Sequence, residues 1–321
     1  MDKENILKII DNFKNKRIGV IGDLMLDQFI WGDVERISPE APVPVVFVEK
    51  ESFVPGGAGN TANNIASLGG EAFIVGLVGK DMAGKKLEQK LQKKGINTQG
   101  LVKNDRFATI QKMRVIARGQ HVVRIDKENH DNLNDEEKSR VLDFISSCIG
   151  NWDSLVISDY AKGFITEDLA KEIIKLAKKY NKFIIADAKP KHAFYFRDVS
   201  LTTPNLQEAK EITGRGNIEE IGKEIQEKLN CNVLITQGAE GMTLFSGEKI
   251  KHFPVKAKEV FDISGAGDTV VAAFSLAQAV GADLETAAII ANQAAGIAVG
   301  KLGTATVSWE ELKEELADGY E

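Results

Sequence analysis

Short apolar runs alternate with amphipathic segments along most of the chain. The pattern predicts an amphipathic helix at 4–13 and a buried strand at 17–21. Further apolar runs predict strands at 72–78, 154–158, 183–186, 201–203 and 232–236. Helical patterns follow several of these strands: one ends before Gly95, one covers 167–180 and one starts at Asn205. Repeated alternation of this kind predicts an α/β fold with a doubly wound, mostly parallel sheet.

Two β-rich stretches interrupt this alternation. Residues 29–54 contain a proline-punctuated run from Ile37 to Val46, which excludes a helix and suits edge strands. Residues 109–126 contain two alternating runs joined at Arg118-Gly119-Gln120, which is the pattern of a hairpin. We expect both stretches to form one small sheet, called the lid, that stands off the main sheet. Because no long linker divides the chain, residues 1–321 are expected to form a single domain.

The composition disfavours several classes of function. The 41 basic and 47 acidic residues are intermixed and give a net charge of −6, which argues against nucleic-acid binding. The four histidines lack the spacing of zinc ligands, and the two cysteines form no C-x-x-C pair, as in a reducing cytosol. The N-terminus is too polar for a signal peptide, and no apolar run reaches the ~18 residues of a membrane helix. We therefore expect a cytoplasmic protein that binds neither nucleic acid nor membrane.

The most informative motif is D-I-S-G-A-G-D-T at 262–269, which an apolar helical run follows. The amides of Gly265, Ala266 and Gly267 can turn toward one point, where the helix start adds partial positive charge. Such a turn binds an anion, most often a phosphate. Asp268 beside it would make sense as a base that takes a proton from a hydroxyl attacking the phosphate. An Asp that caps the helix after a glycine turn explains the same residue equally well.

Two other groups of residues suggest ligand binding. Residues 57–62 fit the G-x-G-x-x-A dinucleotide fingerprint, but they follow a proline-rich β insertion instead of a first strand, which disfavours an NAD-linked oxidoreductase. Three asparagines near this helix start have low helix propensity, and a ligand with hydroxyl groups would explain them. Asp23, with Asp27 close behind, follows a predicted strand at the end where α/β sheets bind ligands, although a turn is the commoner explanation for one Asp.

Asn205 and Glu208 stand three residues apart at a predicted helix start. A capping box explains this N-x-x-E spacing well. The same spacing would also let an amide and a carboxylate hold magnesium through water. From spacing alone the cap is the simpler explanation.

Taken together, these motifs resemble those of the PfkB/ribokinase carbohydrate kinases. Residues 56–69 resemble the first signature of that family, residues 262–274 the second, and residues 203–208 its N-x-x-E element. The order of the motifs is kept over nearly the whole chain. The resemblance implies a ribokinase-like fold with ATP and Mg²⁺ as cofactors, and it leaves a monovalent cation open.

Residues 36–45, 158–163 and 299–304 resemble more closely the kinase part of the bacterial ADP-heptose synthesis proteins. That resemblance implies ATP-dependent phosphorylation of the anomeric hydroxyl of D-glycero-β-D-manno-heptose 7-phosphate. The product would be the 1,7-bisphosphate, an intermediate of lipopolysaccharide or surface-glycan precursors. The sequence departs from that group at 187–190, where D-A-K-P replaces the usual D-P-K-G, and this leaves the shape of the loop open.

The alternatives differ in substrate or in class. The nearest is a PfkB kinase for ribose, fructose 6-phosphate or 2-keto-3-deoxygluconate. A catalytically silent sugar sensor is disfavoured because a sensor needs no base at Asp268. No nucleotidyltransferase domain is expected within the 321 residues, so adenylyl transfer would need a separate protein.

The resemblance also implies roles for individual residues. The base would be Asp268, and the anion hole would be formed by Gly265, Ala266 and Gly267. Sugar hydroxyls would bind to Asp23, Asp27, Gly57 and Asn60. Mg-ATP would be organised by Asn205 and Glu208, with the nucleotide pocket lined by Thr236, Gly238, Gly241 and Lys189. The 7-phosphate would bind to Arg124 and Lys162, with Arg36 as a third cation. The apolar residues and prolines of the lid suggest a homodimer in which two lids pair.

Overall fold

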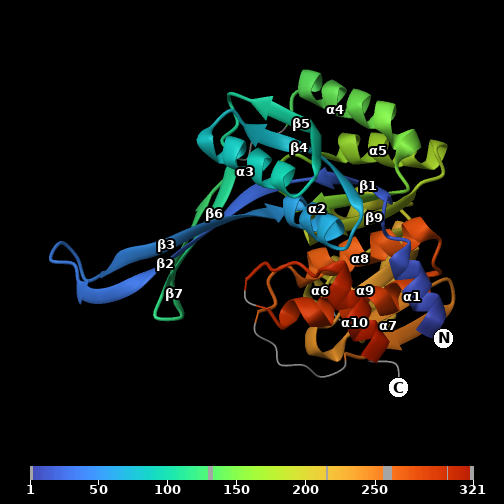
Figure 1. Ribbon diagram of the computed structural model, residues 1–321. Helices are drawn as coiled ribbons and strands as arrows, with labels where there is room; N and C mark the ends of the chain where they lie inside the picture. The colour runs from blue at the N-terminus through green and yellow to red at the C-terminus, as the bar shows by residue number, and fades with distance from the viewer. Residues whose placement is uncertain (1–2, 129–132, 215, 256–261, 302, 319–321) are drawn as a thin grey trace.

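The main body of the protein is built on one nine-stranded sheet. The computed structural model describes residues 3–128, 133–214, 216–255, 262–301 and 303–318 (Figure 1). The strand order is β13-β12-β11-β10-β9-β8-β1-β4-β5. The strands are β1 (Arg17–Gly22), β4 (Glu71–Gly79), β5 (Asn97–Asn104), β8 (Ser154–Asp159), β9 (Phe183–Ala188), β10 (Leu201–Thr202), β11 (Asn232–Thr236), β12 (Met242–Ser246) and β13 (Lys249–Phe253). All neighbouring pairs from β5 to β11 are parallel, and β12 and β13 extend the sheet as an antiparallel hairpin.

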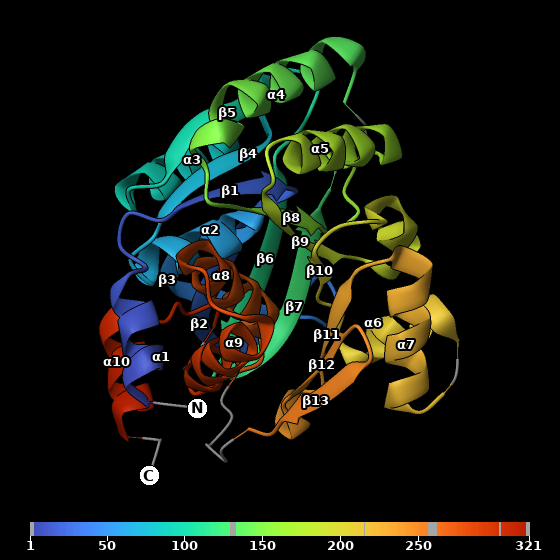
Figure 2. The ribbon, with the colours of Figure 1, turned by 90° about the vertical axis from the view of Figure 1, so that its right-hand side faces the viewer.

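Helices cover both faces of this sheet, as Figure 2 shows. On one face lie α1 (Lys3–Asp11), α2 (Ala58–Ser67), α8 (Ala266–Val280), α9 (Leu284–Val299) and α10 (Trp309–Asp318). On the other lie α4 (Asp135–Cys148), α5 (Glu167–Lys179), α6 (Leu206–Thr213) and α7 (Ile218–Leu229). Successive residues of β1 serve the two layers: Val20 is buried in the first and Ile21 in the second. The predicted doubly wound α/β fold is confirmed.

A second sheet, the lid, projects from the main body (Figure 1). Its order is β3-β2-β6-β7, from β2 (Leu24–Ile37), β3 (Pro44–Gly57), β6 (Ile110–Ala117) and β7 (Gln120–Lys127). The two predicted segments therefore do form one sheet, but β2 begins only two residues after β1 ends. Because β3 runs directly into α2, the lid joins the main body without a linker.

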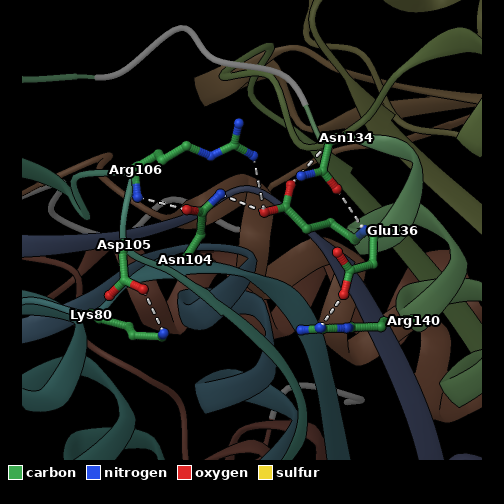
Figure 3. A network of polar contacts seen from close by, with 8 residues as sticks. Lys80, Asn104, Asp105, Arg106, Asn134, Glu136 and Arg140 are labelled. Carbon is green, nitrogen blue, oxygen red and sulfur yellow. Dashed lines mark hydrogen bonds and ion pairs between the residues drawn. The ribbon is translucent and has the colours of Figure 1, made fainter.

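A polar network anchors the chain on both sides of the β6–β7 hairpin. Asn134 and Glu137 form a complete capping box at the start of α4. Asn104, at the end of β5, donates to the same Glu137, and Arg106 lies 3.8 Å from it. Figure 3 shows this network with the neighbouring Lys80–Asp105 pair. The segments that enter and leave the hairpin are thus tied to each other.

Several elements escape the sequence pattern. The sequence pattern assigns no range to the hairpin β12–β13, to strand β5 or to helices α4, α7, α9 and α10. For helix α3 (Met82–Lys93) it predicts the end but not the start. Strand β5 reads N-T-Q-G-L-V-K-N, which is too polar to stand out because it lies at the sheet edge. Among the described residues, none of the helices has both the length and the apolar character required to cross a membrane.

Candidate active site

The candidate site is a small pocket at the carboxyl ends of the central strands, where sheets of this topology bind ligands. It has a volume of about 130 Å³. Its lining includes the predicted residues Lys189, Asn205, Glu208, Thr236, Gly265, Gly267 and Asp268. It also includes Tyr160, Asp187 and Thr203, which the sequence analysis does not identify as site residues.

Asp268 is buried and held by three neutral donors. Its Oδ2 accepts a hydrogen bond from Asn60 Nδ2 at 2.7 Å, and its Oδ1 accepts from Thr61 Oγ1 at 2.8 Å and the Tyr160 hydroxyl at 3.0 Å. Burial raises the pKa of Asp268, which these hydrogen bonds counteract and the charge of Asp27 reinforces. Asp268 is the third residue of α8 and the cap is Gly265, so the N-cap interpretation is wrong. The geometry suits a general base.

The start of α8 offers backbone donors beside this carboxylate. Gly265 has φ +81°, and a Cβ atom there would lie 2.7 Å from Asn60 Nδ2, so the position requires glycine. The first amides of a helix lack a carbonyl partner within the helix and can bind an anion. The Ala266 amide already donates to the Ile263 carbonyl at 3.3 Å. Thr269 Oγ1 donates to Asn64 Oδ1 at 3.0 Å and fixes α8 against α2.

The asparagines of α2 have structural tasks that the sequence did not reveal. Asn60 uses its amide on Asp268, and Asn64 Nδ2 donates to the Asn60 carbonyl at 3.0 Å. Asn63 Oδ1 is buried without a hydrogen-bond partner in the described part of the chain. Binding of sugar hydroxyls by Asn60 stays a prediction, because its amide nitrogen is already engaged.

Asp23 organises the loop after β8. Its carboxylate accepts hydrogen bonds from the backbone amides of Tyr160, Lys162 and Phe164 at 2.9, 3.0 and 3.2 Å. Burial raises its pKa to about 6 against these hydrogen bonds. Ala161 in this loop has φ +57° and donates to Asp159 Oδ1 at 2.7 Å. Asp23 thus positions a strained loop, and its contact with a sugar stays a prediction.

Asp27 lies where β2 enters the lid. Its Oδ1 pairs with Arg114 Nη1 on β6 at 2.9 Å. Its Oδ2 faces Gly56, where a Cβ atom would come within 2.4 Å. Gly57 caps α2 with φ +59°, and a Cβ atom there would lie 2.5 Å from the Asp23 carbonyl. The two glycines therefore let the backbone approach both aspartates.

Asn205 and Glu208 form a complete capping box, as their spacing predicts. Glu208 Oε1 also pairs with Lys189 Nζ at 2.5 Å, which places the lysine of the D-A-K-P loop in the pocket. Asp187 faces the same pocket, and its pKa rises to about 7 through burial and the charges of Asp268 and Glu208. The carboxylates of Glu208 and Asp187 bring negative charge and oxygen ligands together, which suits Mg²⁺.

Magnesium would need ligands from the nucleotide as well. Among the described residues, no group of three His, Cys, Asp or Glu side chains is arranged to hold a metal ion. Mg²⁺ typically binds one or two carboxylates together with substrate phosphates. The pocket therefore fits Mg-ATP better than a free ion.

The remaining predicted residues lie outside the pocket. Gly238 and Gly241 form a turn after β11 with φ +60° and +93°, which alone explains both glycines. Arg124 pairs with Asp126 on its own strand at 3.0 Å and is 60% exposed. Lys162 pairs with Glu128 at 2.5 Å. Arg36 lies near the distal end of β2, about 40 Å along the strand from Leu24, so it cannot reach the pocket of its own subunit.

The sequence held a usable signal for some of the residues it missed. Tyr160 and Asp187 lie at the carboxyl ends of β8 and β9, which is the same criterion that identifies Asp23. Lys112 and Arg114 lie inside a lid strand, where alternation marks their face but says nothing of their partners.

Solved structures share this architecture. Phosphofructokinase-2 from Escherichia coli in complex with potassium aligns with a TM-score of 0.78 and 21% identity, covering 95% of this chain and 98% of that one. Ribokinase from Thermotoga maritima aligns with a TM-score of 0.75 and 23% identity, covering 94% and 100%. The fold is therefore ribokinase-like, as predicted.

Curated relatives are more similar in sequence. "Bifunctional protein HldE" of Desulfatibacillum aliphaticivorans is 40% identical over 326 residues, covering 99% of this chain and 67% of the relative. The protein of the same name from Gluconobacter oxydans is 42% identical over 316 residues, covering 96% and 66%. The chain thus spans about two thirds of the length of these relatives. Residues 15–312 match the family "pfkB family carbohydrate kinase", and the chain belongs to that family.

Proposed function

We propose that this kinase phosphorylates the anomeric hydroxyl of D-glycero-β-D-manno-heptose 7-phosphate for ADP-heptose synthesis. The sequence resemblance suggests the sugar, and the similarity to the HldE proteins over nearly the whole chain supports it. The observation that supports the reaction is Asp268, buried beside the N-terminal amides of α8. We propose that the main body and the lid act as one kinase domain. We also propose that the enzyme works in the cytoplasm, where both ATP and the sugar phosphate are available.

In the proposed reaction Asp268 takes the proton from the anomeric hydroxyl. The hydroxyl oxygen then forms a bond to the γ-phosphorus of ATP, and the bond from that phosphorus to the β,γ-bridging oxygen breaks. The products are the 1,7-bisphosphate and ADP. The amides at Gly265, Ala266 and Gly267 would stabilise the charge on the transferring phosphate. One such donor typically contributes ~10²–10³ in rate.

The nucleotide would lie along the loops after β9, β10 and β11. Asn205, Thr236 and Lys189 line the pocket there, and Asn205 pairs with Thr236 as a parallel β-bridge. Glu208 and Asp187 would hold Mg²⁺, with Asn205 contributing through water. When bound, the ion neutralises charge on the β- and γ-phosphates. A role for Gly238 and Gly241 beside the nucleotide belongs to the same proposal.

A monovalent cation is proposed as a further cofactor. Its support is limited to the phosphofructokinase-2 structure from Escherichia coli, which is a complex with potassium. Activity measured in potassium chloride and in tetramethylammonium chloride at equal ionic strength tests it. Equal rates would contradict the proposal.

We propose that two lids pair in a homodimer. The lid exposes large apolar side chains along β3 and β7, among them Phe47, Val48, Val123 and Ile125. Its outer strands also leave backbone edges that another sheet can cover. Light scattering at micromolar concentration should give the mass of a dimer. A monomer under those conditions would contradict this part of the proposal.

A substrate panel tests the reaction itself. The purified protein is incubated with Mg-ATP and one sugar at a time, and the product is identified by ³¹P NMR. The heptose 7-phosphate should give a second phosphate signal at the anomeric position. The unphosphorylated heptose, ribose, fructose 6-phosphate and 2-keto-3-deoxygluconate serve as comparisons. Faster turnover of any of these would replace the heptose assignment with that sugar.

A further inference from the structure

A buried pair of side chains joins the loops that follow β8 and β9. Asp159, the last residue of β8, has a side chain that is 0% exposed, and its Oδ2 lies 2.7 Å from Nδ1 of His192. His192 belongs to the 3₁₀ helix η2 (Pro190–Phe196), which begins at the proline of the D-A-K-P stretch. An ionised carboxylate only accepts hydrogen bonds, so the imidazole Nδ1 carries the proton. The pair therefore fixes η2 to the end of β8.

Backbone hydrogen bonds reinforce this connection on both sides of Asp159. The Lys189 amide donates to the Asp159 carbonyl at 3.0 Å, and the His192 amide donates to the Lys189 carbonyl at 2.9 Å. In the other loop, the Ala161 amide donates to Asp159 Oδ1 at 2.7 Å. Ala161 has φ +57°, a conformation that is unfavourable for alanine and persists only where neighbouring contacts hold it. Asp159 thus holds both loops, and His192 holds the carboxylate of Asp159.

Each of the two loops carries one residue of the candidate active site. Tyr160, in the loop after β8, donates from its hydroxyl to Asp268 Oδ1 at 3.0 Å. Lys189, in the loop after β9, pairs with Glu208 at the nucleotide end of the pocket. The Lys189 Nζ lies 5.5 Å from the centre of the Tyr160 ring. The position of the base relative to the nucleotide pocket therefore depends on how these loops are joined.

The pair lies behind the reacting groups. Of the described residues that line the candidate active site, neither is Asp159 or His192. His192 lines a separate cavity of about 280 Å³, and its ring stacks on that of Tyr195 with 4.5 Å between the centroids. Burial raises the pKa of Asp159, and the charge and hydrogen bond of His192 oppose this effect. His192 therefore favours the ionised carboxylate and fixes its direction.

We propose that His192 is a positioning residue for the phosphoryl transfer, because through Asp159 it fixes the loop of Tyr160 relative to the loop of Lys189. The inference rests on the proposed function, since it takes Asp268 as the base and places the nucleotide at Lys189. A displacement of about 1 Å between groups that meet in the transition state can lower a rate by about 100-fold. A pair that served only the fold would lower stability when broken and leave the rate per folded molecule unchanged.

The test compares three substitutions of His192. The rate is measured with Mg-ATP and the panel sugar that the wild-type enzyme phosphorylates fastest, and kcat, both KM values and Tm are recorded. His192→Asn keeps a donor, because the amide nitrogen of asparagine is bonded to Cγ as Nδ1 is, so kcat should stay within about threefold of wild type. His192→Gln moves the nitrogen one bond further out, and His192→Phe keeps the ring on Tyr195 without a donor. Both should lower kcat by about 10- to 100-fold and change each KM by less than about threefold.

Lys191→Met is the matched control. Lys191 is exposed, precedes His192 on η2, and its charge also lowers the pKa of Asp159. Its substitution removes a nearby charge but keeps the hydrogen bond from His192, so kcat should stay within about twofold of wild type. Hydrogen exchange gives a second measurement on the same proteins. His192→Phe should speed exchange of the Ala161 and Lys189 amides, which both donate to Asp159, whereas His192→Asn should not.

The outcomes separate this inference from the proposed function. A lower Tm with unchanged kcat in His192→Phe would overturn the inference and leave the pair a purely structural one, as would an equal loss of kcat in Lys191→Met. If His192→Phe does not fold, His192→Gln decides, and a kcat equal to that of His192→Asn would overturn the inference. If the wild-type enzyme phosphorylates no sugar of the panel, the proposed function fails and hydrogen exchange alone judges the inference. Unchanged protection of both amides in the variants without the donor would then overturn it, and faster exchange of both would support it.

Discussion

The negative charge of Asp187 should destabilise the folded protein, although the same carboxylate is proposed to bind Mg-ATP. The residue is the last but one of β9 and faces the pocket with Glu208 and Asp268, so three carboxylates share a small volume. Thr203 Oγ1, at 3.5 Å, is a weak donor to it. Replacing Asp187 with asparagine keeps the size of the side chain and removes one of the three charges. We expect Asp187→Asn to be more stable than the wild-type protein and to use Mg-ATP poorly.

The raised pKa of Asp187 sets the size of the effect. One pKa unit corresponds to 1.36 kcal/mol, so a shift from 3.8 to about 7 gives an upper limit of about 4 kcal/mol. The side chain is only partly buried and opens to the pocket, where water screens the charge. We therefore expect a gain of about 1–2 kcal/mol at pH 8, or roughly 2–5 °C in Tm for a chain of this size.

The sign of the pH dependence follows from the direction of the shift. Because the folded-state pKa lies above the unfolded value, the stability contributed by Asp187 is complete below the unfolded pKa and is lost as the pH rises through about 7. The asparagine of the variant would not titrate. The difference in Tm between the two proteins should therefore be largest at pH 8 and shrink toward pH 5.

Thermal unfolding of both proteins at pH 5 and pH 8, without nucleotide or metal, provides the assay. Asp198→Asn is the matched control, because Asp198 is exposed and its pKa is lowered by Asn230 and Lys178, so its loss should not stabilise the fold. A lower Tm for Asp187→Asn at pH 8, or a difference that does not depend on pH, would refute the electrostatic argument. The rate of Asp187→Asn is also measured as a function of magnesium concentration. A curve equal to that of the wild-type protein would refute the role of Asp187 in Mg-ATP binding.

Three further substitutions test separate parts of the site. Asp268→Asn should fold and bind ATP but lose about 10²–10⁴ in kcat, and single-turnover rates within a few-fold of wild type would exclude it as the base. Glu208→Gln can keep much of the capping box. If the variant needs a higher magnesium concentration for half-maximal rate while its Tm is unchanged, Glu208 has a role in metal binding. If its kinetics are unchanged, Glu208 serves only as a cap. Asp23→Asn should weaken amide protection in the loop 160–164 in hydrogen exchange and raise KM for the sugar, and unchanged exchange would contradict the anchoring role.

The sequence predicted the elements well where apolar runs are long and buried, and less well where the sheet ends. The central strands, the lid and the glycine turn before α8 carry strong local patterns, so they were predicted with bounds close to those observed. The edge strand β5 and the hairpin β12–β13 were missed because edge positions tolerate polar residues.

The partners of the site's side chains are harder to predict from the sequence, because they depend on contacts between distant segments. Asn60 bonds to Asp268 across 208 positions, and Tyr160 bonds to it across 108. No spacing rule within the chain encodes such contacts. Arg36 shows a different limit: its motif resembles that of a substrate-binding group, but β2 is so long that it carries this residue away from the pocket of its own subunit, so the assignment stays a prediction.

The donors around Asp268 explain how a buried carboxylate can remain a useful base. Asn60, Thr61 and Tyr160 are all neutral, and in the described part of the chain no cation forms an ion pair with Asp268. A cation in contact would lower the pKa of Asp268 and weaken its affinity for the proton. Burial and the charge of Asp268 raise the pKa of Tyr160 well above its ordinary value, so the phenol stays protonated and remains a donor. The three hydrogen bonds fix the orientation of the carboxylate and lower its pKa, but burial outweighs them, so the pKa of Asp268 stays raised. Two lysines near this site, Lys112 and Lys189, lie over the Tyr160 ring.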